Sequence, residues 1–273
     1  MGTGISYLHW KEDYKSILQD LSNKKVIMTI SGGKDSSVAM DLILRASKEF
    51  GYDFEAHGGS FPLHRYTDVE KDKIHSYWAS RGVEITWHKS ADSDEPLYNA
   101  ANPCHECQRL NKRVLNNLVN QLLQDWTNFV VIAGYSLWDI VSYAIENILN
   151  NLYSIPDHEE GMRRERNRRL LETAQRFYPI FNLKEGFTVF RPVIKFNTND
   201  IEKHLEEIGI PTISIPCKFK EFRPKRYLMQ YYKKMGMEFD YARVFSYSRD
   251  LPNFPDIDSY SSLGREEYFQ RVF

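Results

Sequence analysis

The sequence is poor in cysteine, with only three among 273 residues, and their spacing is too irregular for the disulfide framework of a small secreted protein. It has no apolar run long enough to cross a membrane and no signal-peptide pattern at its N-terminus. Basic and acidic residues nearly balance, at 36 and 37, so no overall charge attracts nucleic acid. Repeats and low-complexity linkers are absent as well. These absences favour a cytoplasmic protein that has no membrane partner.

The length of the chain allows one large core, with or without a small appendage. Short β-branched runs predict strands at residues 26–30, 53–59, 83–88, 129–134 and 187–193. Helical spacing predicts helices after the first strand and at residues 68–80, 104–124, 137–152, 159–176 and 198–208. The last helix is expected to be capped by Thr198 or Asn199. This alternation predicts an α/β fold with a doubly wound parallel sheet, in which ligands bind beyond the carboxyl ends of the strands.

Three regions are expected along the chain. Residues 1–23 form an N-terminal extension, residues 24–217 form the α/β core, and residues 218–273 form a C-terminal extension. The C-terminal extension is rich in tyrosine and phenylalanine. We therefore expect it to pack on the core through burial of aromatic side chains.

The segment VIMTISGGKDSSVAMDLIL, at residues 26–44, has the features of a phosphate-binding turn. A short apolar strand leads into a turn and then into a helix that Ser36 or Ser37 can cap. Gly32 and Gly33 let the backbone approach a ligand, while the start of the helix directs free N–H groups at it. Lys34 adds a full positive charge. The two commonest phosphate motifs, G-x-x-x-x-G-K-[S/T] and G-x-G-x-x-G, are absent.

The motif SGGKDS, at residues 31–36, resembles the signature of the PP-loop ATP pyrophosphatases. The resemblance implies the adenine nucleotide alpha hydrolase-like fold, ATP and Mg²⁺ as ligands, and cleavage between the α- and β-phosphates with transfer of AMP to a substrate oxygen. It assigns catalytic roles to Lys34 and Asp35. The implied ATP-binding residues are Ser31, Gly32, Gly33, Lys34, Asp35, Ser36, Ser37 and Gly134.

The three cysteines lie at suggestive positions. Cys104 and Cys107 form a C-x-x-C at a predicted helix start, where the helix dipole favours thiolates, and Cys217 follows the last predicted helix of the core. Spacing alone leaves four interpretations open. These are a zinc site completed by a histidine such as His105, a redox C-x-x-C, three separate buried cysteines, and a 4Fe–4S cluster on three thiolates that leaves one iron open.

Two further segments resemble a known family, and this resemblance favours one of the four interpretations of the cysteines. PCHECQRLNKRVL, at residues 103–115, and the segment at residues 190–217 that ends in IPC are similar to segments of bacterial tRNA 2-thiocytidine synthetases. These are iron–sulfur-dependent PP-loop enzymes that replace an activated base oxygen with sulfur. The resemblance implies a 4Fe–4S cluster held by Cys104, Cys107 and Cys217.

The chain departs from that family after the fourth predicted strand. It reads GYSLWD where the family has G-H-x-x-D-D, so a single carboxylate, Asp139, is retained. Asp139 is predicted to be catalytic, holding Mg²⁺ or orienting the nucleotide, and the alternative is an ordinary helix cap. Tyr135 and Trp138 are expected to add aromatic surface at the mouth of the site.

Local basic clusters predict an anionic substrate. The predicted substrate-binding residues are Arg109, Lys112, Arg223 and Arg226, next to the cysteines. A third cluster, at residues 163–169, is either part of this surface or a solvated helix face paired with nearby acids. The favoured function is sulfur transfer to a base of tRNA, with a sulfur donor and a second copy in a homodimer as further partners. The alternatives are thiolation or desulfuration of a free nucleobase or nucleotide, and a non-catalytic ATP and redox sensor.

Overall fold

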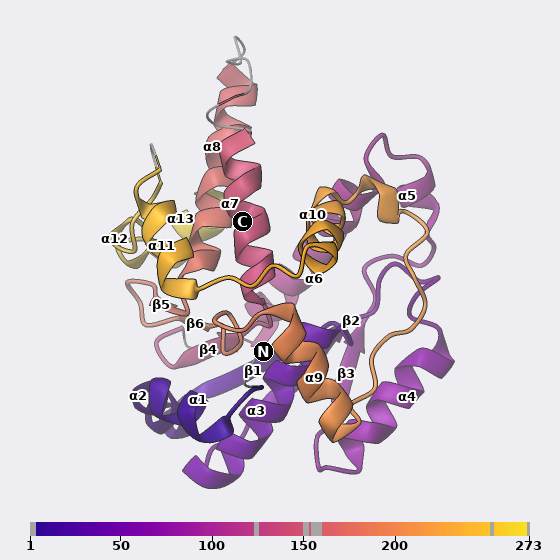
Figure 1. The fold of residues 1–273 in the computed structure, drawn as a ribbon, viewed down its shortest axis with the longest axis vertical. Helices are drawn as coiled ribbons and strands as arrows, with labels where there is room; N and C mark the ends of the chain where they lie inside the picture. Colours follow the sequence, from indigo (N-terminus) through magenta and orange to yellow (C-terminus); the bar gives the residue numbers. More distant parts are fainter. Residues whose placement is uncertain (1–3, 123–125, 150–152, 154–159, 252–253, 272–273) are drawn as a thin grey trace.

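A six-stranded sheet forms the centre of the computed structural model, which describes residues 4–122, 126–149, 153, 160–251 and 254–271 (Figure 1). Its strand order is β3-β2-β1-β4-β6-β5. The strands are β1 (Lys25–Ile30), β2 (Glu55–Gly59), β3 (Ile85–His88), β4 (Phe129–Ile132), β5 (Ile180–Asn182) and β6 (Thr188–Phe190). All neighbours pair in parallel except β5, which runs antiparallel to β6. The strand order reverses between β1 and β4, which is where ligands bind in doubly wound sheets.

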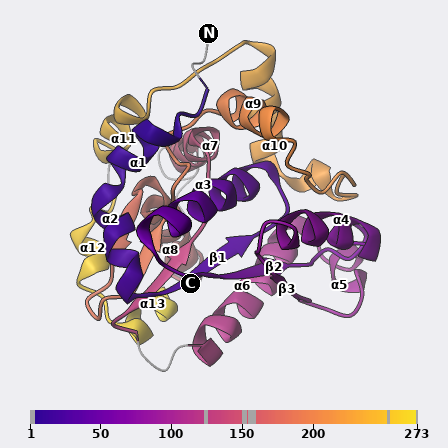
Figure 2. The ribbon, with the colours of Figure 1, turned by 90° about the horizontal axis from the view of Figure 1, so that it is seen from below.

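Helices cover both faces of the sheet (Figures 1 and 2). Those of the core are α3 (Lys34–Phe50), α4 (Asp68–Ala79), α5 (Glu95–Tyr98), α6 (Pro103–Leu122), α7 (Leu137–Ile148), α8 (Glu160–Ala174) and α9 (Thr198–Ile208). Side chains of β1 alternate between the faces, because Val26 and Met28 join the cluster under α3 whereas Ile27 joins the cluster under α6. None of the helices in the described residues is long and apolar enough to span a membrane.

The ends of the chain pack on this core. The N-terminal helices are α1 (Tyr7–Asp13), α2 (Lys15–Asp20) and the 3₁₀ turn η1 (Leu21–Asn23). Trp10 is buried, and its indole N–H donates a hydrogen bond of 2.8 Å to the Pro192 carbonyl oxygen. The C-terminal helices are α10 (Pro224–Lys234), α11 (Tyr241–Arg249), α12 (Asp258–Ser261) and α13 (Arg265–Arg271). Tyr232, Tyr260 and Tyr268 are almost fully buried. The domain boundaries remain predictions.

The α/β fold is confirmed, and three details of the prediction are wrong. The N-cap of α3 is Gly33 rather than Ser36 or Ser37, which lie in the first turn, because the helix begins directly after the glycine pair. The N-cap of α9 is Asn197, whose backbone N–H donates to Asp200 at 3.1 Å. The antiparallel edge strand β5 was not predicted, since three residues carry too little periodicity. The predicted ends of the helices at 104–124, 137–152 and 159–176 extend outside the described residues.

Candidate functional site

The SGGKDS loop, residues 31–36, is held by its own serines. The Ser31 backbone N–H donates to Ser36 Oγ at 3.1 Å, and the Gly33 N–H donates to Ser31 Oγ at 3.3 Å. Gly32 has φ of +64°, and a Cβ there would lie 2.7 Å from a carbon of Ile213. Only glycine satisfies both the backbone conformation and the close approach. The loop is therefore shaped before any ligand binds.

Three helix N-termini converge at the carboxyl edge of the sheet. Lys34 at the start of α3 donates a 2.9 Å hydrogen bond to Thr198 Oγ1 at the start of α9. The N–H of Leu137, at the start of α7, donates to the Phe196 carbonyl just before α9. A Cβ on Gly134 would lie 2.6 Å from the Ser36 Cα, so glycine is required there by backbone packing. The positive ends of three helix dipoles thus meet at one place, which suits a polyanion.

Lys34 and Asp35 both reach this place. The Lys34 ammonium lies 2.7 Å from Asp35 Oδ1, and about a quarter and a fifth of the two side chains are exposed. Ser37, one residue further on, is completely buried, and its hydroxyl has no hydrogen-bond partner among the described residues. Lys34 and Asp35 are thus accessible to a ligand, whereas Ser37 supports the loop from below.

Asp139 is a helix cap and also a charge partner. Its carboxylate is buried and accepts a 3.0 Å hydrogen bond from the Ser136 backbone N–H at the start of α7. The same carboxylate forms an ion pair with Lys225 of α10. Lys225 belongs to the basic segment that follows Cys217, but only 12% of its side chain is exposed. Burial lowers the pKa of Lys225 to about 8, and the nearby Asp35 opposes this shift.

Tyr135 and Trp138 were both expected at the mouth of the site, and the structure places them differently. Trp138 was expected at the mouth of the site, but it is 1% exposed and donates its indole N–H to Asn197 Oδ1 at 3.1 Å. Tyr135 is partly exposed, and the guanidinium groups of Arg176 and Arg191 lie 5.5 and 6.0 Å from its ring centroid. Trp138 therefore connects α7 to the N-cap of α9 by a hydrogen bond, while the ring of Tyr135 lies near two guanidinium groups.

Arg191 was not predicted as a site residue. It follows β6 directly, is 3% exposed, and donates to the Tyr178 carbonyl at 2.9 Å. Its Nε has no hydrogen-bond partner among the described residues, and burial lowers its pKa to about 10. The only sequence signal is an arginine at the carboxyl end of a strand, where a doubly wound sheet binds its ligands.

The three cysteines come from two distant segments. Cys104 and Cys107 lie in the first turns of α6, and the Cys104 thiol donates to the Phe219 carbonyl oxygen at 3.4 Å. Cys107 and Cys217 pack against the same apolar group, which contains Phe61, Leu97, Leu110 and Phe219. Burial, followed by the neighbouring Cys217 and Cys104, raises the pKa of Cys107 to about 12. The three thiols are thus close enough for the charge of one to raise the pKa of another.

The three thiols are free, two of them pack against the same apolar group, and Cys104 contacts the Phe219 backbone beside it, which suits a cluster with three cysteine ligands. Burial raises the pKa of Cys104 and Cys107, and bound iron cations would reverse this shift by stabilising thiolates. Among the described residues, no group of three or more His, Cys, Asp or Glu side chains is arranged to hold a metal ion. The donor set of three free thiols therefore fits a 4Fe–4S cluster in number and chemistry.

A single segment connects the cysteines to the SGGKDS loop. The Ile213 N–H donates to the Gly32 carbonyl at 2.8 Å, and Cys217 lies four residues later. On the other side of the loop, the Tyr66 hydroxyl donates to the Ser31 carbonyl at 2.9 Å. Burial is the main cause that raises the pKa of Tyr66, and Cys107 and Cys217 contribute. Tyr66 thus lies between the loop and the thiols.

A histidine fixes the chain just after Cys217. His64 Nε2 accepts a 3.0 Å hydrogen bond from the Lys218 backbone N–H, and His64 Nδ1 lies 2.7 Å from Asp94 Oδ2. Asp94 also accepts backbone N–H groups of Leu63 and His64. This arrangement needs the Nδ1–H tautomer of His64 and orients the segment that carries the third cysteine.

The four predicted substrate-binding residues differ in their surroundings. Arg109 is half exposed and pairs with Glu106 on its own helix. Lys112 is directed at α8 instead, where its ammonium lies 2.5 Å from Glu172 Oε2. Arg223 is exposed and close enough to lower the pKa of both Cys104 and Cys107. Arg226 lies 3.7 Å from Glu221. Arg223 is therefore the member of this set placed best to meet an anionic ligand near the cysteines.

The basic helix α8 is partly neutralised by its own acids. Arg164 pairs with Glu160 at 2.9 Å, and Arg168 pairs with Glu172 at 3.4 Å. Glu172 also accepts Arg176 at 2.6 Å. The pairs of Arg164 and Arg168 are the intrahelical pairs that the alternative interpretation of residues 163–169 expected.

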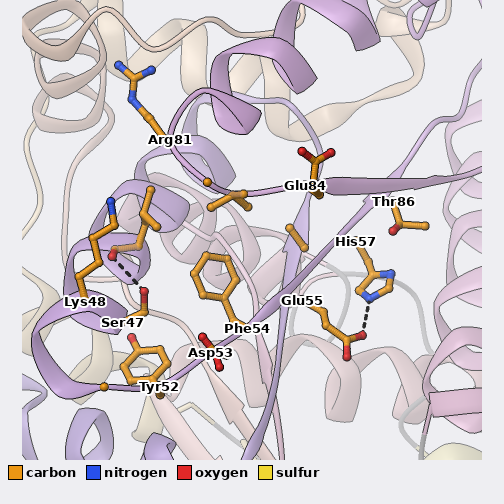
Figure 3. Close-up of a pocket in the computed structure, with 15 residues that line it drawn as sticks. Ser47, Lys48, Tyr52, Asp53, Phe54, Glu55, His57, Arg81, Glu84 and Thr86 are labelled. Atoms are coloured by element: carbon orange, nitrogen blue, oxygen red, sulfur yellow. Dashed lines mark hydrogen bonds and ion pairs between the residues drawn. The ribbon is translucent and has the colours of Figure 1, made fainter.

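A pocket of about 870 Å³ lies at the opposite, amino-terminal edge of the sheet (Figure 3). It is formed by the end of α3, the start of β2 and the turn between α4 and β3. Lys48, Glu55, Arg81 and Glu84 are among the charged residues that line it. None of the predicted site residues lines this pocket.

No family model and no curated protein matches the sequence. Solved structures do match. U34-tRNA thiolase NcsA from Methanococcus maripaludis, solved with its [4Fe-4S] cluster, is similar with a TM-score of 0.61 at 16% identity, over 97% of this chain and 92% of that chain. NMN synthetase from Francisella tularensis matches with a TM-score of 0.47 at 13% identity, over 98% of this chain and 91% of that chain. This chain therefore has the fold of the PP-loop ATP pyrophosphatases, as its SGGKDS motif predicts.

Proposed function

We propose that this chain is an ATP-dependent sulfurtransferase that thiolates a nucleobase of tRNA. One observation carries the proposal: the segment that hydrogen-bonds Gly32 of the SGGKDS loop reaches Cys217 four residues later, beside Cys104 and Cys107. This connection supports a nucleotide-activating site and a sulfur-handling site that would act next to each other. The similarity in fold to a tRNA thiolase that contains a [4Fe-4S] cluster supports the same assignment.

The first step is activation of the base. A carbonyl oxygen of the base attacks the α-phosphorus of ATP, the bond to the β-phosphate breaks, and pyrophosphate leaves. The loop N–H groups, the three helix N-termini and Lys34 would bind the triphosphate and stabilise the charge that develops on pyrophosphate. Asp35 is adjacent to Lys34 and would orient its ammonium group or hold Mg²⁺.

The second step is substitution at carbon. A sulfur nucleophile adds to the activated carbon, the C–O bond breaks, and AMP leaves with the former carbonyl oxygen. A 4Fe–4S cluster on Cys104, Cys107 and Cys217 would supply an iron without a protein ligand, at which sulfide can bind. Arg223 is exposed beside the thiols and would attract the phosphates of the substrate towards them.

The experiment that tests this proposal measures ATP cleavage by anaerobically purified protein. Addition of tRNA and sulfide should produce AMP and pyrophosphate in equal amounts, and omission of tRNA should suppress both. A sensor would bind ATP without releasing pyrophosphate. If free nucleobases or nucleotides stimulated AMP formation and tRNA did not, the small-molecule reaction would replace the tRNA reaction.

A further inference from the structure

The helix α10 has two chemically different faces. Its inner face packs against α7. Tyr232 of α10 is 2% exposed, and its ring centroid lies 5.6 Å from that of Trp138 of α7. Lys225 points inwards from the same helix to Asp139. The outer face exposes Tyr227 and Tyr231, which are 50% and 54% exposed. These two tyrosines are four residues apart, so their side chains are neighbours on one face.

The outer face continues into the 3₁₀ turn η4 (Lys220–Phe222) that precedes the helix. Phe222 is 46% exposed, and the Tyr227 hydroxyl donates to the carboxylate of Glu221, which brings the helix and the turn together. We call Phe222, Tyr227 and Tyr231 the aromatic stripe. Of the eleven large hydrophobic residues that are exposed in the described part of the chain, four lie between residues 222 and 235. Exposed hydrophobic residues gathered on one surface, unlike single ones, indicate a binding site.

The stripe is embedded in positive charge. Residues 218–235 contain seven lysines and arginines and a single acid, Glu221. Lys220, Arg223 and Lys234 form no ion pair among the described residues. Cations interleaved with exposed aromatic rings are the features with which proteins bind unpaired nucleotides, because bases stack on the rings while phosphates meet the cations.

We propose that the aromatic stripe binds the unstacked bases of single-stranded RNA, such as a tRNA loop, and presents that RNA to the cysteine site. The stripe lies next to this site. The Phe219 carbonyl oxygen accepts a hydrogen bond from the Cys104 thiol, and the charge of Arg223 lowers the pKa of both Cys104 and Cys107. The turn η4, which precedes α10, contacts α6, the helix on which two of the cysteines lie. This inference rests on the proposed function for the identity of its RNA.

A second copy of the chain is a poorer occupant. In a symmetric dimer the same surface patch meets itself, so the exposed Lys220, Arg223 and Lys234 of one copy would face those of the other. Like charges brought together in this way destabilise an interface. RNA offers the opposite charge and flat rings in the same molecule.

The test measures binding of a short single-stranded RNA and of a matched RNA duplex by fluorescence anisotropy. The double variant Tyr227→Ala/Tyr231→Ala should bind the single strand at least about tenfold more weakly and bind the duplex as the wild type does. Tyr231→Phe should retain binding, because the ring is kept. The matched control is Tyr247→Ala on α11, which removes a tyrosine that is 59% exposed elsewhere.

Wild-type affinity of the double variant for the single strand would overturn the inference, as would the absence of any single-strand binding by the wild type. Conversion of a wild-type dimer into a monomer by the double variant, without loss of RNA affinity, would assign the stripe to a second copy. The proposed function is judged separately, by AMP formation on addition of tRNA. Stripe-dependent RNA binding without AMP formation would disprove the function and leave the inference standing.

Discussion

The ammonium group of Lys225 forms an ion pair with the carboxylate of Asp139, although 86 positions separate them in the sequence. The pair joins the C-terminal helix α10 to the first turn of α7 and lies close enough to Asp35 to be influenced by its charge. It thus connects the C-terminal helices with the SGGKDS loop.

Removal of Lys225 should be costly, because it leaves Asp139 buried without a cation. We predict that Lys225→Met lowers the free energy of unfolding by about 3 kcal/mol or more, as measured by urea denaturation. Lys233→Met is the matched control on the same helix and should cost less than about 1 kcal/mol, since its partner Glu202 lies at the surface. The double variant Asp139→Asn/Lys225→Met should recover part of the loss. Equal losses of unfolding free energy in Lys225→Met and Lys233→Met would show that the buried ion pair contributes no more stability than the exposed one.

The carboxylate of Glu70 predicts an acid-sensitive contact. Hydrogen bonds from Lys73 and from both the hydroxyl and the N–H of Ser214 lower the pKa of Glu70 to about 2. A lowered carboxyl pKa contributes stability at pH values above about 4.5, the ordinary value for this group, and the contribution is lost as pH falls towards 2. Glu70→Gln should therefore lower the melting temperature by a few degrees at pH 6, with the difference shrinking below pH 4.5.

The control for this prediction is Asp72→Asn, an exposed carboxylate on the same helix. Its melting temperature should follow that of the wild type across the whole range. A difference between Glu70→Gln and the wild type that persisted unchanged at pH 3 would contradict the assignment of this contact to the ionised carboxylate.

Lys34 and Asp35 should be required for turnover but not for folding. We predict that Lys34→Ala and Asp35→Ala each abolish AMP formation and leave the circular dichroism spectrum unchanged, because both side chains are partly exposed at the site. Lys48→Ala removes a lysine from the far end of the same helix and should keep wild-type turnover. Wild-type turnover in either loop variant would mean that catalysis takes place elsewhere.

The cysteines can be tested by metal content. Anaerobically purified protein should be brown and contain about four irons and four sulfides per chain. Serine substitution of Cys104, Cys107 or Cys217 should remove most of the iron, whereas His105→Ala should keep it. A colourless protein with one zinc that is lost in His105→Ala would establish the zinc site that spacing alone also allowed.

Sequence patterns were sufficient for the loop and for the parallel strands β1, β2, β3, β4 and β6, because their signals are local. The run before Ser31 is β-branched and apolar, which indicates a strand. The glycine pair after Ser31 indicates a turn at the strand end in which the backbone can approach a phosphate. Asp139 could be placed at the start of α7 for the same reason. Lys225 could not be placed, since its burial depends on how α10 docks against α7, and a lysine among five basic residues is typical of a solvated surface.

Lys112 and Trp138 illustrate the same difficulty. Lys112 is close to the cysteines in sequence, but its side chain is directed at Glu172 on α8, a partner 60 residues away. Trp138 is next to the retained carboxylate, but helical geometry turns it into the core against Asn197. Proximity in sequence predicted the neighbourhood of these residues and not the direction of their side chains.

The central claim is that the protein places sulfur on a base of tRNA, and mass spectrometry of nucleosides tests it most directly. Purified wild-type protein, given unmodified tRNA, ATP and sulfide without oxygen, should yield a nucleoside heavier by the replacement of one oxygen with sulfur. The product should be absent without ATP and absent with Lys34→Ala or Cys217→Ser. A complete reaction that leaves the tRNA nucleosides unchanged while a free nucleobase or nucleotide gains sulfur would contradict the account.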